Sequence, residues 1–185
     1  MQAIIKTDDI GFLTQWSPEA EEIFGFGKGE VEGWYLGIFI HSIENMTNEK
    51  RKGMGPEHIL EEVVENKRTI SFSTINIRGD LKAFFNTIEI RPDKEGTVAT
   101  ITKGEDTEDI IRYNEMIDEH SDKALVVTSR TGRIFGINGK FALKAKFNRM
   151  RLLNRPLGLV EDAERYDLQE IFGSLDGYLL AWPVE

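Results

Sequence analysis

The 185-residue chain contains no cysteine and only three histidines. The absence of cysteine excludes disulfides, thiolate metal sites, iron–sulfur clusters, cysteine nucleophiles and flavin photochemistry that needs a cysteinyl adduct. Three histidines are too few for a histidine-rich metal site, and we expect no metal. The chemistry of this protein must therefore come from other side chains or from a bound molecule.

Long apolar runs are also missing, so we expect no membrane-spanning segment. The first residues, MQAIIKTDD, have neither a basic region nor a long apolar core, so they do not resemble a secretory signal. Apolar residues make up 40% of the chain and charged residues 30%, which is typical of a folded globular protein. A cytoplasmic protein of one or two domains is the simplest expectation.

Charge is unevenly distributed along the chain, whose net charge is −9. Residues 123–160 hold nine basic residues and no acidic one, whereas the remainder is acidic. This basic segment is interpreted either as a solvated face that pairs with the acidic remainder or as a surface for nucleic acid or another acidic partner. No interleaved aromatic residues and no nucleic-acid motif support the second interpretation, so we do not expect nucleic acid as the partner.

An offset of 121 residues aligns segment 3–41 with segment 124–162 without a gap. Only six of the 39 pairs are identical, but the apolar positions also coincide, which indicates two copies of one supersecondary unit. Each copy predicts a strand, a turn containing glycine, a second strand and a helix. Ser17 and Asn138 stand where the helices begin, and we expect both to be N-caps rather than ligand contacts.

The first copy continues with a helix over 56–66 and strands over 69–77, 81–91 and 97–103. A charged amphipathic helix over 105–121 follows. Its apolar stripe is predicted to consist of Ile110, Ile111, Asn114 and Ile117, and to be buried either within the chain or in a homodimer.

The second copy stops before its three closing strands. It offers a helix-like piece over 166–172, a turn over 174–177 and one strand over 178–184. Because an unpaired sheet edge is a liability, this strand is expected to close its own sheet or to pair with the first copy or another chain, unless the sequence is cut from a longer protein.

The sequence GFLTQWSPEAEEIFGF (11–26), followed by EVEG (30–33) and FIHS (39–42), resembles the PAS family of sensor domains. The resemblance covers residues 1–105. It implies an α+β fold with a PAS-like five-stranded antiparallel sheet and short helices on one face. Residues 106–121 then resemble the linker helix between PAS units, and residues 122–185 a second, truncated PAS-like unit.

The resemblance also implies a function, namely a non-catalytic sensory module that binds a small molecule or a protein partner and relays the change through its linker helix. Residues of the first copy that would line a ligand pocket, or simply fill the core, are Trp16, Phe24, Trp34, Phe39, Phe72, Phe84 and Ile88. The alternative function is a transcription-associated regulator that contacts nucleic acid through segment 123–160. A homodimer or another protein partner is expected in the first case.

We expect no tightly bound cofactor, while non-covalent flavin and haem stay open. His58 lies on the helix where haem-binding PAS domains place their axial ligand, but glutamates crowd that helix and a surface role is favoured. His41 is expected to make a structural hydrogen bond, and His120 lacks the kinase domain that a phosphoacceptor would need. No set of carboxylates, serine and histidine predicts catalysis, so no catalytic residue is expected.

Overall fold

The computed structural model describes residues 1–39, 56–129, 132–146, 149–153, 155–157, 163–168 and 177–183. The segment FIHS after Phe39, with His41, and the predicted turn 174–177 except for Gly177 lie outside these residues. The chain forms two compact units. The first comprises Met1–Asn76 and Phe84–Glu105, and the second comprises Ile77–Ala83 and Asp106–Glu185.

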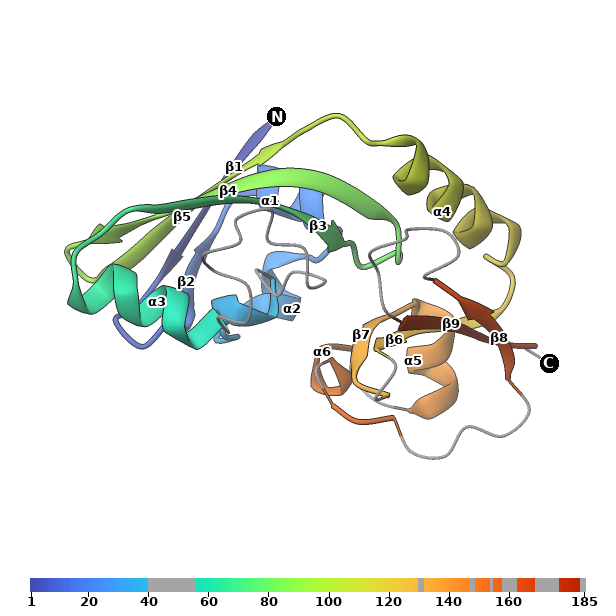
Figure 1. The fold of residues 1–185 in the computed structure, drawn as a ribbon. Coiled ribbons are helices and arrows are strands. Elements are labelled where there is room, and N and C mark those ends of the chain that lie inside the picture. The colour runs from blue at the N-terminus through green and yellow to red at the C-terminus, as the bar shows by residue number, and fades with distance from the viewer. Residues whose placement is uncertain are drawn as a thin grey trace. The chain divides into compact units, whose positions relative to one another are not determined.

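A five-stranded antiparallel sheet of order β2-β1-β5-β4-β3 forms the body of the first unit (Figure 1). This confirms the predicted fold class, including the hairpin of the third and fourth strands. The strands are β1 (Gln2–Thr7), β2 (Leu13–Trp16), β3 (Ile70–Ile77), β4 (Ala83–Asp93) and β5 (Gly96–Lys103).

Short helices connect β2 to β3, and their apolar faces contribute to the core. They are α1 (Pro18–Phe24), α2 (Lys28–Val31), the 3₁₀ helix η1 (Leu36–Ile38) and α3 (Pro56–Glu65). Ser17 caps α1 as predicted, because its Oγ accepts a hydrogen bond from the backbone N–H of Ala20 at 3.2 Å. Gly25, with φ +68°, ends the helix in the left-handed conformation that glycine adopts without strain.

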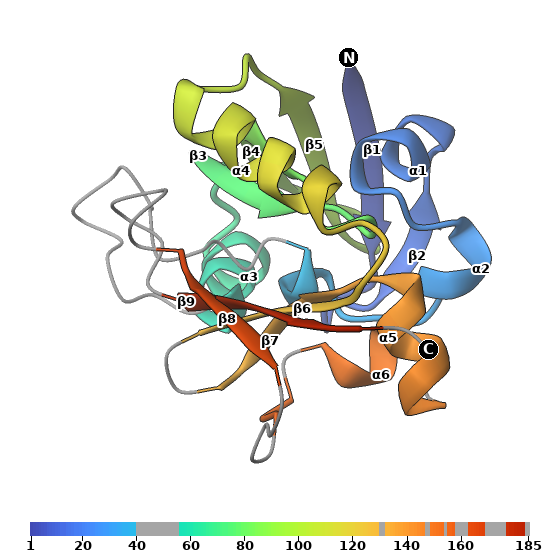
Figure 2. The same ribbon diagram turned by 90° about the vertical axis from the view of Figure 1, so that its right-hand side faces the viewer.

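The second unit holds a four-stranded sheet of order β7-β6-β9-β8, seen in Figure 2 with β8 at its edge. Its elements are α4 (Glu108–Glu119), β6 (Ala124–Ser129), β7 (Ile134–Ile137), α5 (Gly139–Ala145), α6 (Arg149–Leu152), β8 (Glu164–Asp167) and β9 (Gly177–Trp182). Strand β9 pairs with β6 from Ala124 opposite Trp182 to Ser129 opposite Gly177. The last predicted strand therefore closes its own sheet.

The helix-like piece predicted over 166–172 is wrong at its start. Tyr166 and Asp167 belong to strand β8, which pairs with β9. The guanidinium of Arg165 lies 3.6 Å from the centre of the Tyr178 ring on the neighbouring strand. Strand pairing and this cation–π contact outweigh the local helical pattern, which spans less than two turns here.

The two units repeat the same backbone contacts at the offset of 121. Ile5 lies opposite Trp16 in the first hairpin, and Val126 lies opposite Ile137 in the second. The carbonyl of Gly11 accepts from the N–H of Leu36, and that of Gly132 accepts from the N–H of Leu157. The aligned segments thus share local structure, while the assignment of residues 122–185 as a second, truncated PAS-like unit stays a prediction.

The buried face of α4 differs from the predicted stripe. Ile110 and Ile117 are buried as expected, but Ile111 is 48% exposed and Tyr113 is fully buried. Positions 110, 113 and 117 follow the three-to-four-residue repeat of one helical face, and Ile111 lies about 100° around the helix from Ile110. None of the helices that the structure describes is long and apolar enough to cross a membrane.

Candidate functional site

Aromatic side chains cluster in the core of the first unit. The ring of Trp16 lies 5.4 Å from that of Phe24 and 4.9 Å from that of Phe39, between ring centroids. Phe24 also lies 5.5 Å from Phe84 in an edge-to-face contact. The structure therefore brings together four of the residues that the sequence singled out, in tilted and edge-to-face ring contacts.

The other three predicted residues surround this cluster less directly. Phe72 on β3 and Ile88 on β4 are buried in the same core. Trp34 is only half-buried, and its backbone carbonyl accepts a hydrogen bond from the N–H of Leu13 at 2.8 Å. Its contact with β2 is thus made by the backbone.

Polar side chains occupy core positions of β3 and β4. Side chains alternate between the two faces of a strand, so Phe72, Thr74 and Asn76 share the buried face of β3. On β4 the same alternation places Asn86 between Phe84 and Ile88 on the buried face. The two asparagines were not among the predicted site residues, although their positions within the apolar alternation indicate that they face the core.

Thr74 and Asn86 lie next to each other on neighbouring strands. The hydroxyls of Ser73 and Thr87 are hydrogen-bonded at 3.0 Å across this hairpin, and the N–H of Arg78 donates to the carbonyl of Lys82 at 2.8 Å. Continuing this register places Thr74 opposite Asn86. Asn76 is then the diagonal neighbour of Asn86 on the same face, within reach of one ligand.

The amides of these asparagines have unmet hydrogen-bonding capacity. Asn86 is fully buried and Asn76 is 4% exposed. In the described part of the chain, neither Nδ2 nor Oδ1 of Asn86 has a hydrogen-bond partner, and nor does Nδ2 of Asn76. A buried polar group without a partner costs about 1–3 kcal/mol, so native cores rarely keep one without a reason.

The histidines do not complete a haem site in the described residues. His58 is exposed on α3, whereas Ile59, Leu60 and Val63 form the buried face of that helix. His120 ends α4, where its Nδ1 lies 3.1 Å from the carbonyl of Met116. No group of three or more potential metal ligands occurs among the residues that the structure describes.

A partly buried network of polar side chains links His120 to the edge strand of the second unit. Nε2 of His120 lies 2.6 Å from the hydroxyl of Tyr166, which donates to Glu164 at 2.8 Å. Lys123 also donates to Glu164. Hydrogen bonds from Lys123 and then Tyr166 lower the pKa of the Glu164 carboxyl, and the bond to Glu164 raises the pKa of Lys123. These hydrogen bonds join the end of α4 to β8, and we assign them a structural role.

Comparisons with known proteins returned solved structures only. No protein-family model and no curated protein matches the chain. It is similar to the crystal structure of the PAS domain of a protein from Colwellia psychrerythraea, with 20% identity over 56% of this chain and 86% of that one, at a TM-score of 0.42. It is also similar to the PAS domain of the histidine kinase ThkA, with 23% identity, 55% and 98% coverage and a TM-score of 0.38.

A third similar structure is the Rhodobacter sphaeroides LOV protein, with 12% identity over 62% of this chain and 66% of that one, at a TM-score of 0.41. In the chain itself, the five-stranded antiparallel sheet and the helices inserted between β2 and β3 agree with the architecture that the sequence predicted. The first unit therefore has a PAS-like α+β fold.

Proposed function

We propose that the protein is a non-catalytic sensory module whose first unit binds a small planar ligand between its sheet and its helices. The observation that carries the proposal is the buried amide of Asn86, which has no hydrogen-bond partner among the described residues, together with the unpartnered Nδ2 of Asn76 on the same face. In the described core, the buried polar side chains are serine, threonine and asparagine. None of these types titrates near neutral pH, which favours binding over acid–base catalysis.

The two free atoms of Asn86 define the ligand's chemistry. A carboxamide offers a donor and an acceptor side by side, so its complement is a ring edge that presents an acceptor beside a donor. Cyclic amides and imides have such an edge. The neighbouring rings of Phe24, Phe72 and Phe84 favour an apolar, planar body attached to it.

Of the two cofactors that the sequence left open, flavin fits this description. Asn86 and Asn76 would hold the pyrimidine-like edge of its ring system, and the aromatic cluster would contact the rest. A bound flavin would supply absorption of blue light and a change of redox state. Haem does not fit the described residues, because His58 points away from the core. Pairing with a protein partner or a second copy remains part of the proposal as the output.

Equilibrium binding of riboflavin and FMN tests the proposal, with flavin fluorescence and the absorption spectrum of the purified protein as readouts. We expect wild-type protein to bind one of the two. Asn86→Leu should weaken binding at least about tenfold, because it removes hydrogen bonds that are worth about 1 kcal/mol each.

Glu89→Gln is the matched control, since Glu89 lies on the exposed face of the same strand. This variant should bind like wild type. A wild-type protein that is colourless and binds neither flavin, or an Asn86→Leu variant that binds flavin with unchanged affinity, contradicts the proposed site.

A further inference from the structure

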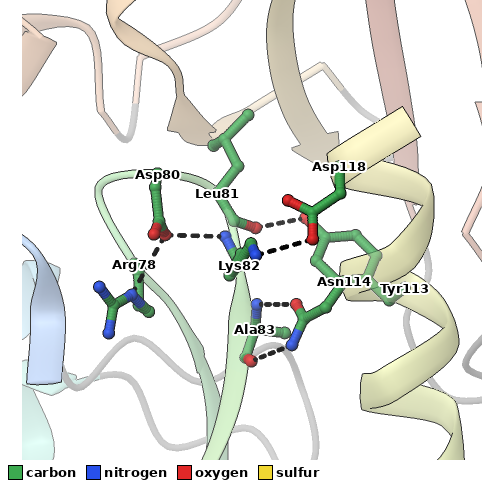
Figure 3. Close-up of polar contacts among 8 residues, drawn as sticks. All are labelled: Arg78, Asp80, Leu81, Lys82, Ala83, Tyr113, Asn114 and Asp118. Atoms are coloured by element: carbon green, nitrogen blue, oxygen red, sulfur yellow. Dashed lines mark hydrogen bonds and ion pairs between the residues drawn. The ribbon is translucent and has the colours of Figure 1, made fainter. Parts of the chain in front are cut away.

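The segment Ile77–Ala83, here called the β3–β4 loop, runs from the last residue of β3 to the first residue of β4 and belongs to the second unit. Figure 3 shows Tyr113 and Asn114 of α4 pointing at the backbone of this loop. The hydroxyl of Tyr113 donates a hydrogen bond to the carbonyl of Leu81 at 2.9 Å. Burial raises the pKa of the Tyr113 phenol far above its ordinary value, and the charge of Asp80 acts in the same direction. The phenol therefore remains a donor at physiological pH.

Asn114 binds the backbone of Ala83 through both ends of its amide. Its Oδ1 accepts from the N–H of Ala83 at 2.8 Å, and its Nδ2 donates to the carbonyl of Ala83 at 3.0 Å. Pairing between β4 and β5 ends at Asn86 opposite Lys103, so Ala83 lies beyond the end of that ladder. The amide of Asn114 supplies the peptide-like partner that a neighbouring strand would otherwise provide.

Side chains fix the same loop in place. Leu81 is fully buried although its φ is +72°, a conformation that is strained for leucine. A Cβ atom at Gly136 of β7 would lie 2.7 Å from Cδ2 of Leu81 and 3.2 Å from Cγ2 of Ile77. Glycine at position 136 therefore leaves room for the loop, and the ion pair of Lys82 with Asp118 at 2.8 Å adds a further contact.

We propose that this loop transmits structural changes from β3 and β4 to α4. The changes reach α4 through its hydrogen bonds to the backbone groups of Leu81 and Ala83. Asn76 immediately precedes the loop and Asn86 follows it closely on β4, so a ligand held by both asparagines acts on the two strands that carry the loop. Hydrogen bonds weaken steeply with distance and angle, so a small shift of the loop changes the contacts with Tyr113 and Asn114. The role of a ligand in this inference rests on the proposed function, whereas the contacts between the loop and α4 do not.

Amide hydrogen exchange of the full chain tests the transmission without any ligand. The perturbation is Asn86→Leu, and the readouts are the amides of Ala83 and of α4. We expect Asn86→Leu to change their exchange rates at least about threefold, and we expect this response to be lost when Asn114→Ala is also present. Such non-additivity is the signature of coupled sites.

Tyr113→Phe is the milder second variant, because it keeps the buried ring and removes one hydrogen bond. Glu115→Ala is the matched control on an exposed position of the same helix. Unchanged protection of β6 and β9 will show that the second unit remains folded in each variant. Exchange in α4 that is the same in wild type and Asn86→Leu, or a response that persists undiminished with both Asn114→Ala and Tyr113→Phe, overturns the inference.

Addition of FMN separates this inference from the proposed function. Protection of α4 that follows FMN binding supports both. A chain that binds no FMN but shows the coupling between Asn86 and Asn114 overturns the proposed ligand and supports the transmission role of the loop.

Discussion

At the scale of single residues, a close approach of two backbone segments requires glycine at position 96, the first residue of β5. Its φ is +152°, and a Cβ atom there would lie 2.2 Å from the carbonyl oxygen of Thr7. Any side chain at this position must displace the end of β1, which pairs with β5 through Thr7 opposite Thr97. Position 96 therefore requires glycine both because of its backbone conformation and because a side chain would clash with β1.

We predict that Gly96→Ala lowers the free energy of unfolding of the first unit by about 3 kcal/mol. Gly29→Ala is the matched control, because Gly29 lies in α2 and a Cβ atom there would meet no atom within 4 Å. This control should raise stability by about 0.5–1 kcal/mol through the helix propensity of alanine. Urea denaturation of both variants measures the difference, and a Gly96→Ala variant as stable as wild type would show that the turn can relax.

The sequence predicted the apolar core at this scale but not the polar residues within it. The strand pattern placed Phe72 and Ile88 in the core, because apolar side chains at every second position of a strand share one face. Phe84 was selected only through the resemblance to PAS domains. Asn86 stands at the same phase, yet a polar residue in an apolar pattern is usually taken as an interruption. Tyr113 was missed because the partner of its hydroxyl, the carbonyl of Leu81, lies 32 residues away in the sequence.

At the scale of elements, Asn138 joins a helix to a strand. Its Oδ1 caps α5 by accepting from the N–H of Phe141 and also accepts from the N–H of Leu125, while its Nδ2 donates to the carbonyl of Lys123. Ser17 makes the corresponding two accepted bonds in the first unit, from Ala20 and Ile4. The cap residue thus also fixes the first strand of each hairpin.

We predict that Asn138→Ala destabilises the second unit by about 2 kcal/mol, because the cap and the strand contacts are lost together. Asn138→Ser should cost about half as much, since a serine hydroxyl can accept from both N–H groups as Ser17 does. Thermal unfolding monitored in the second unit distinguishes them. Equal losses for alanine and serine would mean that the donated bond to Lys123 dominates.

The elements themselves were predictable where local signals were strong. The strands of the first unit and the helix cap at Ser17 followed from alternation, turn glycines and the serine–proline start of α1. Strand β8 was not predictable, because the four residues Glu164–Asp167 carry charged and polar side chains. Its strand conformation comes from pairing with β9, a segment that begins ten residues later in the sequence. A pattern within Glu164–Asp167 cannot indicate that pairing.

At the scale of the whole molecule, one face of α4 is buried in the second unit and the other is exposed. Ile117 is 3% exposed and supports the second unit, whereas Ile111 is 48% exposed and is available to a second copy. The proposed homodimer would therefore use the face of Ile111 rather than the complete stripe that the sequence predicted.

We predict that Ile117→Lys unfolds the second unit or destabilises it by at least about 3 kcal/mol, because it buries a charge without a partner. Ile111→Lys should leave the fold intact and should lower the molecular mass in solution if wild type is a dimer. Light scattering over a range of concentrations, with circular dichroism as the folding control, measures both. A dimer that survives Ile111→Lys would place the interface elsewhere.

One part of the division into two units could not be predicted from sequence, namely the assignment of Ile77–Ala83 to the second unit. Segments 1–105, 106–121 and 122–185 follow from the repeat and from the charged helix between its copies. Membership of Ile77–Ala83 in the second unit depends on the fit of Leu81 against Gly136 and of Ala83 against Asn114. The hydrophobic pattern of a sequence does not indicate contacts between residues that are this far apart in the chain.

The discontinuous second unit has a consequence for synthesis on the ribosome. Its first piece, Ile77–Ala83, leaves the exit tunnel before Tyr113 and Asn114 do, by roughly 2 to 6 s at ordinary translation rates. During that interval the last strand of the first unit, Gly96–Lys103, is also translated, so the β3–β4 hairpin can form on the nascent chain. Because the loop is translated before α4, we expect α4 to fold against it, and codon changes that slow or speed this stretch should alter folding yield without altering the mature protein.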